Sequence, residues 1–228
     1  MLMRTHFLKP FRGEGKSKKM KPVQLFFSKL PSLKQVLSLN KILYVLIFSD
    51  FVVISAYGLL APIFAVFLLE KISGSTLVVI GISEAIYLVT KSLIQVPLGI
   101  IIDKTKGEEI DFWFLFLGNL IMSLALFAYI WVSMPWHIYI IAFIYGVGGA
   151  LAYPAWTGLF TRNIVENKES FAWSFSTTFV ELGRAGAAVL GAVIGEFLGF
   201  NSLFIIVGGL SLLGTFLLFI FFDDLIKN

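Results

Sequence analysis

Five ionisable side chains lie within long apolar stretches of this sequence, where a charge is costly. They are Asp50, Glu84, Lys91, Glu181 and Arg184. A charge at the centre of a membrane helix costs roughly 2.5 to 3.5 kcal/mol even on insertion scales, and such residues usually face a helix interface or a wet cavity. We therefore take these residues as candidates for a transport or proton pathway.

Spacing groups several of these candidates on shared helix faces. Gln95 follows Lys91 by one helical turn, and Glu84 precedes Lys91 by two turns, so all three lie on one face. Glu181 and Arg184 make a comparable stripe farther along the chain. The six residues Asp50, Glu84, Lys91, Gln95, Glu181 and Arg184 are thus predicted to line a substrate or proton pathway. The alternative is that some only hold helices together, as Glu181 and Arg184 can at i, i+3.

The charges in these stretches do not balance. Three carboxylates, those of Asp50, Glu84 and Glu181, face two cations, Lys91 and Arg184. A surplus carboxylate in a dry site can stay protonated and so carry a proton. Proton coupling is therefore a hypothesis that the sequence raises.

The elements that hold these residues must be membrane helices. Of the 228 residues 58% are hydrophobic and 14% are charged, with a mean hydropathy of +0.90, which excludes a soluble domain. Apolar runs of this length span a bilayer as helices, and they lack the alternation of barrel strands. We predict an all-α, polytopic membrane protein with six transmembrane helices, at 42–69, 76–102, 112–133, 138–161, 171–198 and 202–222.

The first 40 residues differ from the rest. They hold nine Lys or Arg residues and one acid, and we assign 1–40 to a basic tail and 41–228 to a transmembrane domain. A short interfacial helix in the tail is possible, because apolar residues recur there at helical spacing. Those residues are Leu30, Leu33, Val36 and Leu37. A solvated basic tail is the favoured alternative.

The distribution of cations predicts the orientation. Fifteen of the 18 Lys and Arg residues fall on one side of the predicted spans, and Lys71 is the one cation in the opposite loops. Cytoplasmic segments carry this excess in membrane proteins. We therefore expect both termini in the cytoplasm and a location in a cell membrane, specifically a bacterial inner membrane.

The six spans also read as two sets of three. The first and fourth spans each combine glycine with proline, at Gly58 and Pro62 and at Gly146 and Pro154, and are built to bend. The second and fifth carry the charges and should be central, whereas the third and sixth are nearly all apolar and should face lipid. An odd number of spans per set makes the second set inverted, and such 3+3 inverted repeats are typical of transporters.

Small residues recur every fourth position in the fifth span. They are Gly183, Ala187, Gly191 and Gly195. A ridge of this kind lets a second helix approach closely. Helix packing is the expected role.

The end of the second span carries a motif. It reads Pro97-Leu-Gly99-Ile-Ile-Ile-Asp103-Lys104 and resembles the signature G-x-x-x-D-[RK]-x-G-[RK]-[RK] of the major facilitator superfamily, in the loop where that family has it. Gly99 is expected to allow close packing at the helix end, and Asp103 beside Lys104 to form a gating charge cluster.

The match to the family signature is partial. Lys106 stands where the family has glycine, and Gly107 comes one place late. Glu108 and Glu109 replace the usual basic pair. The resemblance also includes the glycine-rich fourth span and the fifth-span glycines, so it covers about residues 41 to 222.

The resemblance implies a secondary transporter that works by alternating access, with a substrate site between two six-helix halves. This sequence resembles the N-terminal half alone. A homodimer or a partner half is therefore expected, together with the lipid bilayer and a small-molecule substrate; no nucleic acid is expected. The alternative is a non-transporting scaffold or a truncated transporter remnant.

Other functions find little support. The string Gly81-Ile82-Ser83-Glu84 resembles a serine protease motif, but the two histidines, His6 and His137, lie outside the spans. There is no cysteine, and the P-loop pattern is absent. We expect no enzyme activity, no cofactor and no metal.

Overall fold

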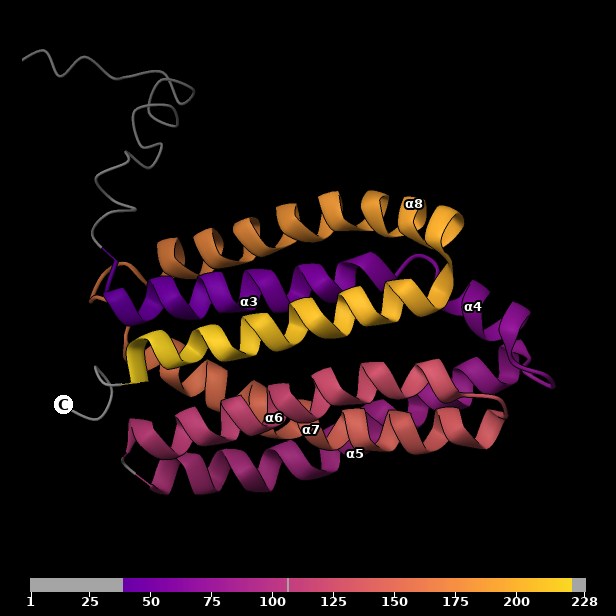
Figure 1. Cartoon of the computed structure of the whole chain (residues 1–228). Helices are drawn as coiled ribbons and strands as arrows, with labels where there is room; N and C mark the ends of the chain where they lie inside the picture. The colour runs from indigo at the N-terminus through magenta and orange to yellow at the C-terminus, as the bar shows by residue number, and fades with distance from the viewer. Residues whose placement is uncertain (1–38, 106, 223–228) are drawn as a thin grey trace, which may run out of the picture. The chain divides into compact units, whose positions relative to one another are not determined.

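The computed structural model describes residues 39–105 and 107–222, and within these ranges it is helical without strands (Figure 1). Its elements are α3 (Lys41–Leu60), α4 (Phe64–Lys71), α5 (Leu77–Lys104), α6 (Glu108–Ala128), η1 (Tyr129–Trp131), α7 (Pro135–Arg162), α8 (Glu169–Leu217) and η2 (Leu218–Phe221). The basic tail, for which a short interfacial helix and a solvated segment were the alternatives, falls outside the described residues.

Five helices are long and apolar enough to cross a membrane. They are Lys41–Leu60, Leu77–Lys104, Glu108–Trp131, Pro135–Arg162 and Glu169–Ile220. The sequence predicts six, and the difference lies in α8, whose bounds include the fifth predicted span and most of the sixth. Gly199 interrupts α8 with φ 78° and ψ 167°, a conformation that favours glycine, and the ribbon reverses direction there (Figure 1). We call 169–198 the first arm of α8 and 200–217 its second arm.

Proline has different effects in the two spans predicted to bend. The first span breaks at Pro62, because α3 ends at Leu60 and α4 begins at Phe64. In contrast, α7 is one continuous helix through Pro154. A membrane helix can tolerate proline when neighbouring helices and side chains support it.

The third span begins earlier than predicted. It starts at Glu108 rather than at residue 112, with Gly107 as the N-cap. Its first turn carries Glu108, Glu109 and Asp111, and carboxylates stabilise the positive end of the helix dipole. The polarity of residues 108–111 alone predicts a loop, which is why the predicted span began at residue 112.

The helices pack in a definite order. α5 packs on α7, α7 on α6, and α6 on α8, while α3 packs on α8. Close approach depends on glycine at these contacts: a β-carbon on Gly191 would overlap the Leu59 carbonyl, and one on Gly118 would meet the backbone of Gly148 and Ala152. Both arms of α8 contact α3, since Gly191 lies in the first arm and Gly214 of the second arm lies against Val53.

Burial does not follow the predicted division into central and lipid-facing spans. Only 11% of the most apolar window of α5 is buried, against 50% in α3, α6 and α7. The polar residues of the third and sixth spans are instead core residues: Ser123, Ser211 and Thr215 are fully buried. Their hydroxyls satisfy one another and the helix backbone, so they pack inward rather than toward lipid.

Candidate functional site

Two of the predicted residues, Asp50 and Lys91, line the same cavity. This cavity, the Asp50 chamber, has a volume of about 270 Å³ and lies between α3, α5, α6 and α7. Its walls are largely aromatic or apolar, with one amide. They comprise Asp50, Val53, Ile54, Tyr57, Tyr87, Lys91, Leu115, Asn119, Met122, Tyr145, Gly149, Ala152, Tyr153 and Trp156.

Glu84 lines a second cavity on the same four-helix face. This Glu84 chamber has a volume of about 260 Å³. Glu84 is the one acidic side chain in its wall, which also holds four tyrosines. The wall comprises Tyr57, Leu60, Ala61, Phe64, Ser83, Glu84, Tyr87, Leu126, Tyr129, Ala142 and Tyr145.

Three tyrosines belong to both chambers and separate them. They are Tyr57, Tyr87 and Tyr145, which we call the tyrosine partition. The Tyr145 ring lies 5.8 Å from that of Tyr57, edge to face, and 5.5 Å from that of Tyr87. On α3, the wall residues before Tyr57 belong to the Asp50 chamber and those after it to the Glu84 chamber. On α5 the order is reversed, because Glu84 precedes Tyr87 and Lys91 follows it. The two chambers are therefore stacked along the helix axes.

Aromatic rings hold the Lys91 ammonium in the Asp50 chamber. Its Nζ lies 4.7 Å from the centroid of the Tyr153 ring and 5.9 Å from that of Tyr87. A ring face attracts a cation at such distances, most strongly where water is excluded. No salt bridge joins Lys91 to Asp50 among the described residues, although both line one cavity.

The Tyr57 hydroxyl is tied to the core. The Ser211 hydroxyl donates to it over 3.2 Å, and the hydroxyls of Ser211 and Ser123 lie 2.6 Å apart. Ser123 also donates to the Asn119 carbonyl over 2.7 Å. This buried set connects the partition to α6 and to the second arm of α8.

Glu181 and Arg184 lie elsewhere. They form an i, i+3 ion pair on the first arm of α8, with 2.9 Å between Oε1 and Nη1. Their side chains are 57% and 46% exposed, and neither lines a chamber. The structure thus places this pair outside the cavity that holds Asp50 and Lys91.

Gln95 and the predicted gating loop line a third cavity. Gln95, Gly99, Asp103 and Arg162 share its wall at the end of the bundle where α3 begins, and its volume is about 600 Å³. Lys104, the last residue of α5, is exposed. The close packing expected at Gly99 is absent from the described residues, since a β-carbon there would have no neighbour within 4 Å.

The same end of the bundle holds charged contacts that we did not predict. The Arg162 guanidinium pairs with Asp111, whose side chain is 1% exposed. The Asn163 amide donates to Glu108 over 3.0 Å and accepts a hydrogen bond from Asn40 over 3.0 Å. These contacts tie α6 to α7 and to the start of α3.

The predicted small-residue ridge lies against α3. A β-carbon on Gly183 would meet Phe51 and Ser55, and one on Gly195 would meet Ile63. Ala187 is buried, as is Gly191. The ridge therefore lies at a helix contact rather than at either chamber.

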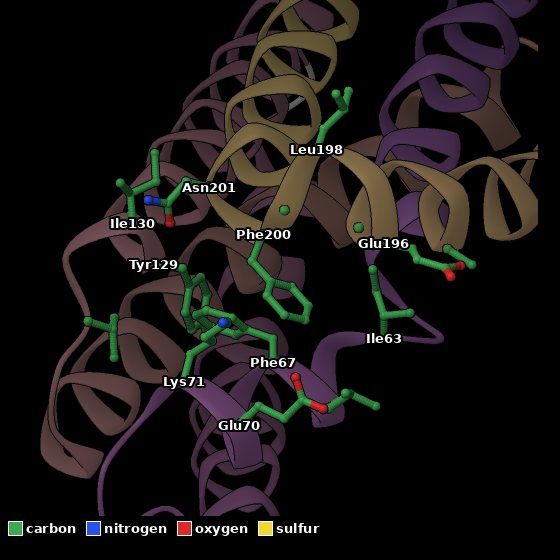
Figure 2. A pocket seen from close by; sticks show the side chains of 15 residues that line it. Ile63, Phe67, Glu70, Lys71, Tyr129, Ile130, Glu196, Leu198, Phe200 and Asn201 are labelled. Carbon is green, nitrogen blue, oxygen red and sulfur yellow. The ribbon is translucent and has the colours of Figure 1, made fainter.

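A cavity larger than either chamber lies at the end of the bundle opposite the start of α3 (Figure 1) and is seen from close by in Figure 2. Its volume is about 910 Å³, and α4, η1 and the α8 reversal surround it. Glu70, Lys71 and Glu196 supply its charges, and the Lys71 Nζ lies 5.9 Å from the centroid of the Phe200 ring. Of the residues predicted from the sequence, Gly195 alone reaches this wall.

Sequence reasoning found the charges but missed the aromatic residues around them. A signal was available, because Tyr57-Gly58 and Tyr145-Gly146 are the same dipeptide in corresponding spans. Only the glycines of these dipeptides were interpreted, as residues that let the helices bend. Among the described residues no group of three His, Cys, Asp or Glu side chains could hold a metal.

Comparison with known proteins identifies the family. Residues 46–227 match the family model described as Major Facilitator Superfamily. The chain is also 27% identical over 160 residues to the "Multidrug resistance protein MdtG" of Salmonella schwarzengrund (strain CVM19633), a match that covers 69% of this chain and 38% of that relative. The chain thus spans well under two thirds of the curated relative's length. With helices long enough to cross a bilayer and a family match over most of its length, this multi-pass membrane protein belongs to the major facilitator superfamily.

Proposed function

We propose that the chain forms one six-helix half of a secondary active transporter, which moves a small solute by alternating access. The solute path runs through the Asp50 chamber and the Glu84 chamber. One observation carries the proposal: Asp50, Lys91 and Glu84 line two stacked cavities that share three tyrosines. Ionisable groups within a membrane domain are expected at such a path.

Six crossings arranged as a 3+3 inverted repeat are part of this proposal. The reversal at Gly199 divides α8 into two arms, each of which would cross once. The serines that meet in the core, Ser123 and Ser211, are 88 residues apart. The same separation relates Tyr57 to Tyr145 and Gly58 to Gly146 in the sequence.

Helix contacts support the same repeat. α3 packs on both arms of α8, and α7 packs on α5 and α6. With α3 equivalent to α7, this is the pattern that a two-fold relation between the sets would produce. Its axis would pass near the Ser123–Ser211 contact, where the third span meets the sixth.

A second half is proposed to complete the transport path. The relative is much longer than this chain, and the poorly buried α5 offers a surface for another set of helices. We expect the purified chain to form a homodimer, or to bind a separate partner half. Native mass spectrometry and crosslinking in detergent test this, and a strict monomer that also captures no partner half would contradict it.

The orientation and the gating loop are proposed together. The excess of cations supports a cytoplasmic location for both termini and for the loop after α5, in a cell membrane such as a bacterial inner membrane. Gly99, Asp103 and Lys104 would then act at the cytoplasmic end of the path. Asp103 shares a cavity with Arg162 there, which supports an electrostatic role for this loop.

Proton coupling is tested by replacing the acids with amides. We expect Asp50→Asn or Glu84→Gln to lower pH-gradient-driven uptake by about tenfold or more, because an amide cannot exchange a proton. Glu181→Gln tests the pair on α8, and the exposed Glu109→Gln at the start of α6 is the matched control. Uptake of a panel of labelled organic solutes into proteoliposomes is the measurement. Unchanged uptake in every acid variant would refute proton coupling.

The scaffold or remnant function is the alternative. The same proteoliposome measurement distinguishes it from the transport function, because a scaffold or remnant would move no solute, either alone or with candidate partner halves. Flux above that of protein-free vesicles would exclude it.

A further inference from the structure

We propose that the tyrosine partition is a gate between the two chambers. A small monovalent organic cation passes this gate by leaving the side chain of Glu84 and binding that of Asp50. This inference rests on the proposed transport function and names the class of solute. It assigns roles to Tyr57, Tyr87 and Tyr145 as gate residues.

The geometry places the gate on the line between the two acids. Asp50 lies two turns before Tyr57 on α3, so both are on one helix face. On α5, Glu84 lies one turn before Tyr87, and Lys91 lies one turn after it. A solute that moves from one carboxylate to the other along the helix axes therefore passes the three rings.

The rings fill the space between the chambers by contact with one another. Tyr145 is the central member, because its ring contacts those of both Tyr57 and Tyr87. Each chamber is of similar size, about 260 and 270 Å³, which suits a small organic molecule rather than a large one. Opening the gate joins two small cavities into one longer path.

The charges in the walls favour a cation. The two chambers together contain two carboxylates, Asp50 and Glu84, and one ammonium, Lys91. When both acids are ionised, a single positive charge from a solute balances the three groups. The Lys91 ammonium itself, 4.7 Å above Tyr153, shows that a ring face in this cavity accepts a cation.

A hydrogen bond sets the position of one gate ring. Ser211 binds the Tyr57 hydroxyl and is held in turn by Ser123, and both serines are fully buried. Ser211 itself lines neither chamber and acts through Tyr57, so it is a positioning residue for the gate. Loss of this bond should free the Tyr57 ring without removing it.

The chain contains no cysteine, which allows a direct test with single thiols. Ile54→Cys places a thiol in the Asp50 chamber, and Ala61→Cys places one in the Glu84 chamber. The two positions lie on either side of Tyr57. The probes are two methanethiosulfonates, one with a trimethylammonium group and one with a sulfonate, added outside intact cells that express the full chain.

With the gate intact, one of the two cysteines should react much more slowly than the other. Tyr145→Ala should raise the slow rate by about tenfold. Tyr57→Phe and Ser211→Ala each remove the hydrogen bond between these two side chains and leave a ring at position 57, and each should raise the slow rate about threefold. Phe143→Ala, which removes an exposed ring of α7 that lines neither chamber, is the matched control and should leave the slow rate unchanged.

The two probes test the charge of the solute. We expect the cationic probe to reach the slow cysteine about tenfold faster than the anionic one, after correction for their rates with a free thiol, and Glu84→Gln to remove most of this preference. Preference for the sulfonate would overturn the cation assignment. Equal rates at the two cysteines, or no effect of Tyr57→Phe and Ser211→Ala, would overturn the gate even if Tyr145→Ala failed to fold.

Labelling requires no transport, so the two proposals can fail separately. A chain that shows gated labelling without solute flux would retain the gate and lose the transport function. A chain that carries solute but labels equally in both chambers would retain the function and lose the gate.

Discussion

Replacing Arg162 with methionine is expected to lower the free energy of unfolding by about 3 kcal/mol. Asp111, its partner, is 1% exposed at the start of α6, so the substitution leaves a buried carboxylate without its cation. Breaking a buried pair by removing one member is much more costly than replacing both. Reversible unfolding in mixed detergent micelles, followed by tryptophan fluorescence, measures the change.

Two further variants separate the ion pair from other effects. Asp111→Asn combined with Arg162→Met should recover much of the lost stability, because no unpaired charge remains. Lys104→Met removes an exposed cation from the end of α5, and we expect a change within about 0.5 kcal/mol. A double variant that is no more stable than Arg162→Met would show that the pair itself does not determine the cost.

Hydropathy predicted most of the helices, since apolar runs of this length must satisfy their backbone groups internally. It placed the second span within two residues of α5 at each end. It failed at Glu108, because acidic residues that stabilise a helix start look like a loop when only polarity is considered. It also could not show that Pro62 breaks its helix whereas Pro154 does not, which depends on the surrounding packing.

The candidate site was partly predictable for a related reason. Charges inside a span are unusual, so Asp50, Glu84 and Lys91 stood out, and the structure places all three on the two chambers. Glu181 and Arg184 stood out equally, yet they pair on the surface of α8. Sequence spacing relates residues on one helix, whereas a cavity is formed by residues from several.

The tyrosines and serines were not predicted as site residues because neither type is unusual in a membrane helix. Tyr145 and Ser211 acquire significance only through partners far away in the sequence. The third and sixth spans were expected to face lipid, whereas their serines Ser123 and Ser211 lie in the core. Their matching positions in the two sets of spans could have indicated this contact.

The second large effect is expected from filling the Asp50 chamber. A β-carbon on Gly149 would lie 3.6 Å from the Lys91 side chain and from the Tyr87 ring, so the site accepts a small addition. Gly149→Leu would extend past that point and occupy the chamber. Gly209→Leu is the matched control, since Gly209 is exposed on the second arm of α8 with open space around it.

The most direct measurement of the transport function is therefore solute uptake into proteoliposomes, with the chain alone or with its partner half, compared across these variants. We predict uptake above that of protein-free vesicles for the unchanged chain and for Gly209→Leu, and a loss of at least about tenfold for Gly149→Leu. Uptake that Gly149→Leu leaves unchanged, or no uptake by any form of the protein, would contradict a solute path through the Asp50 chamber.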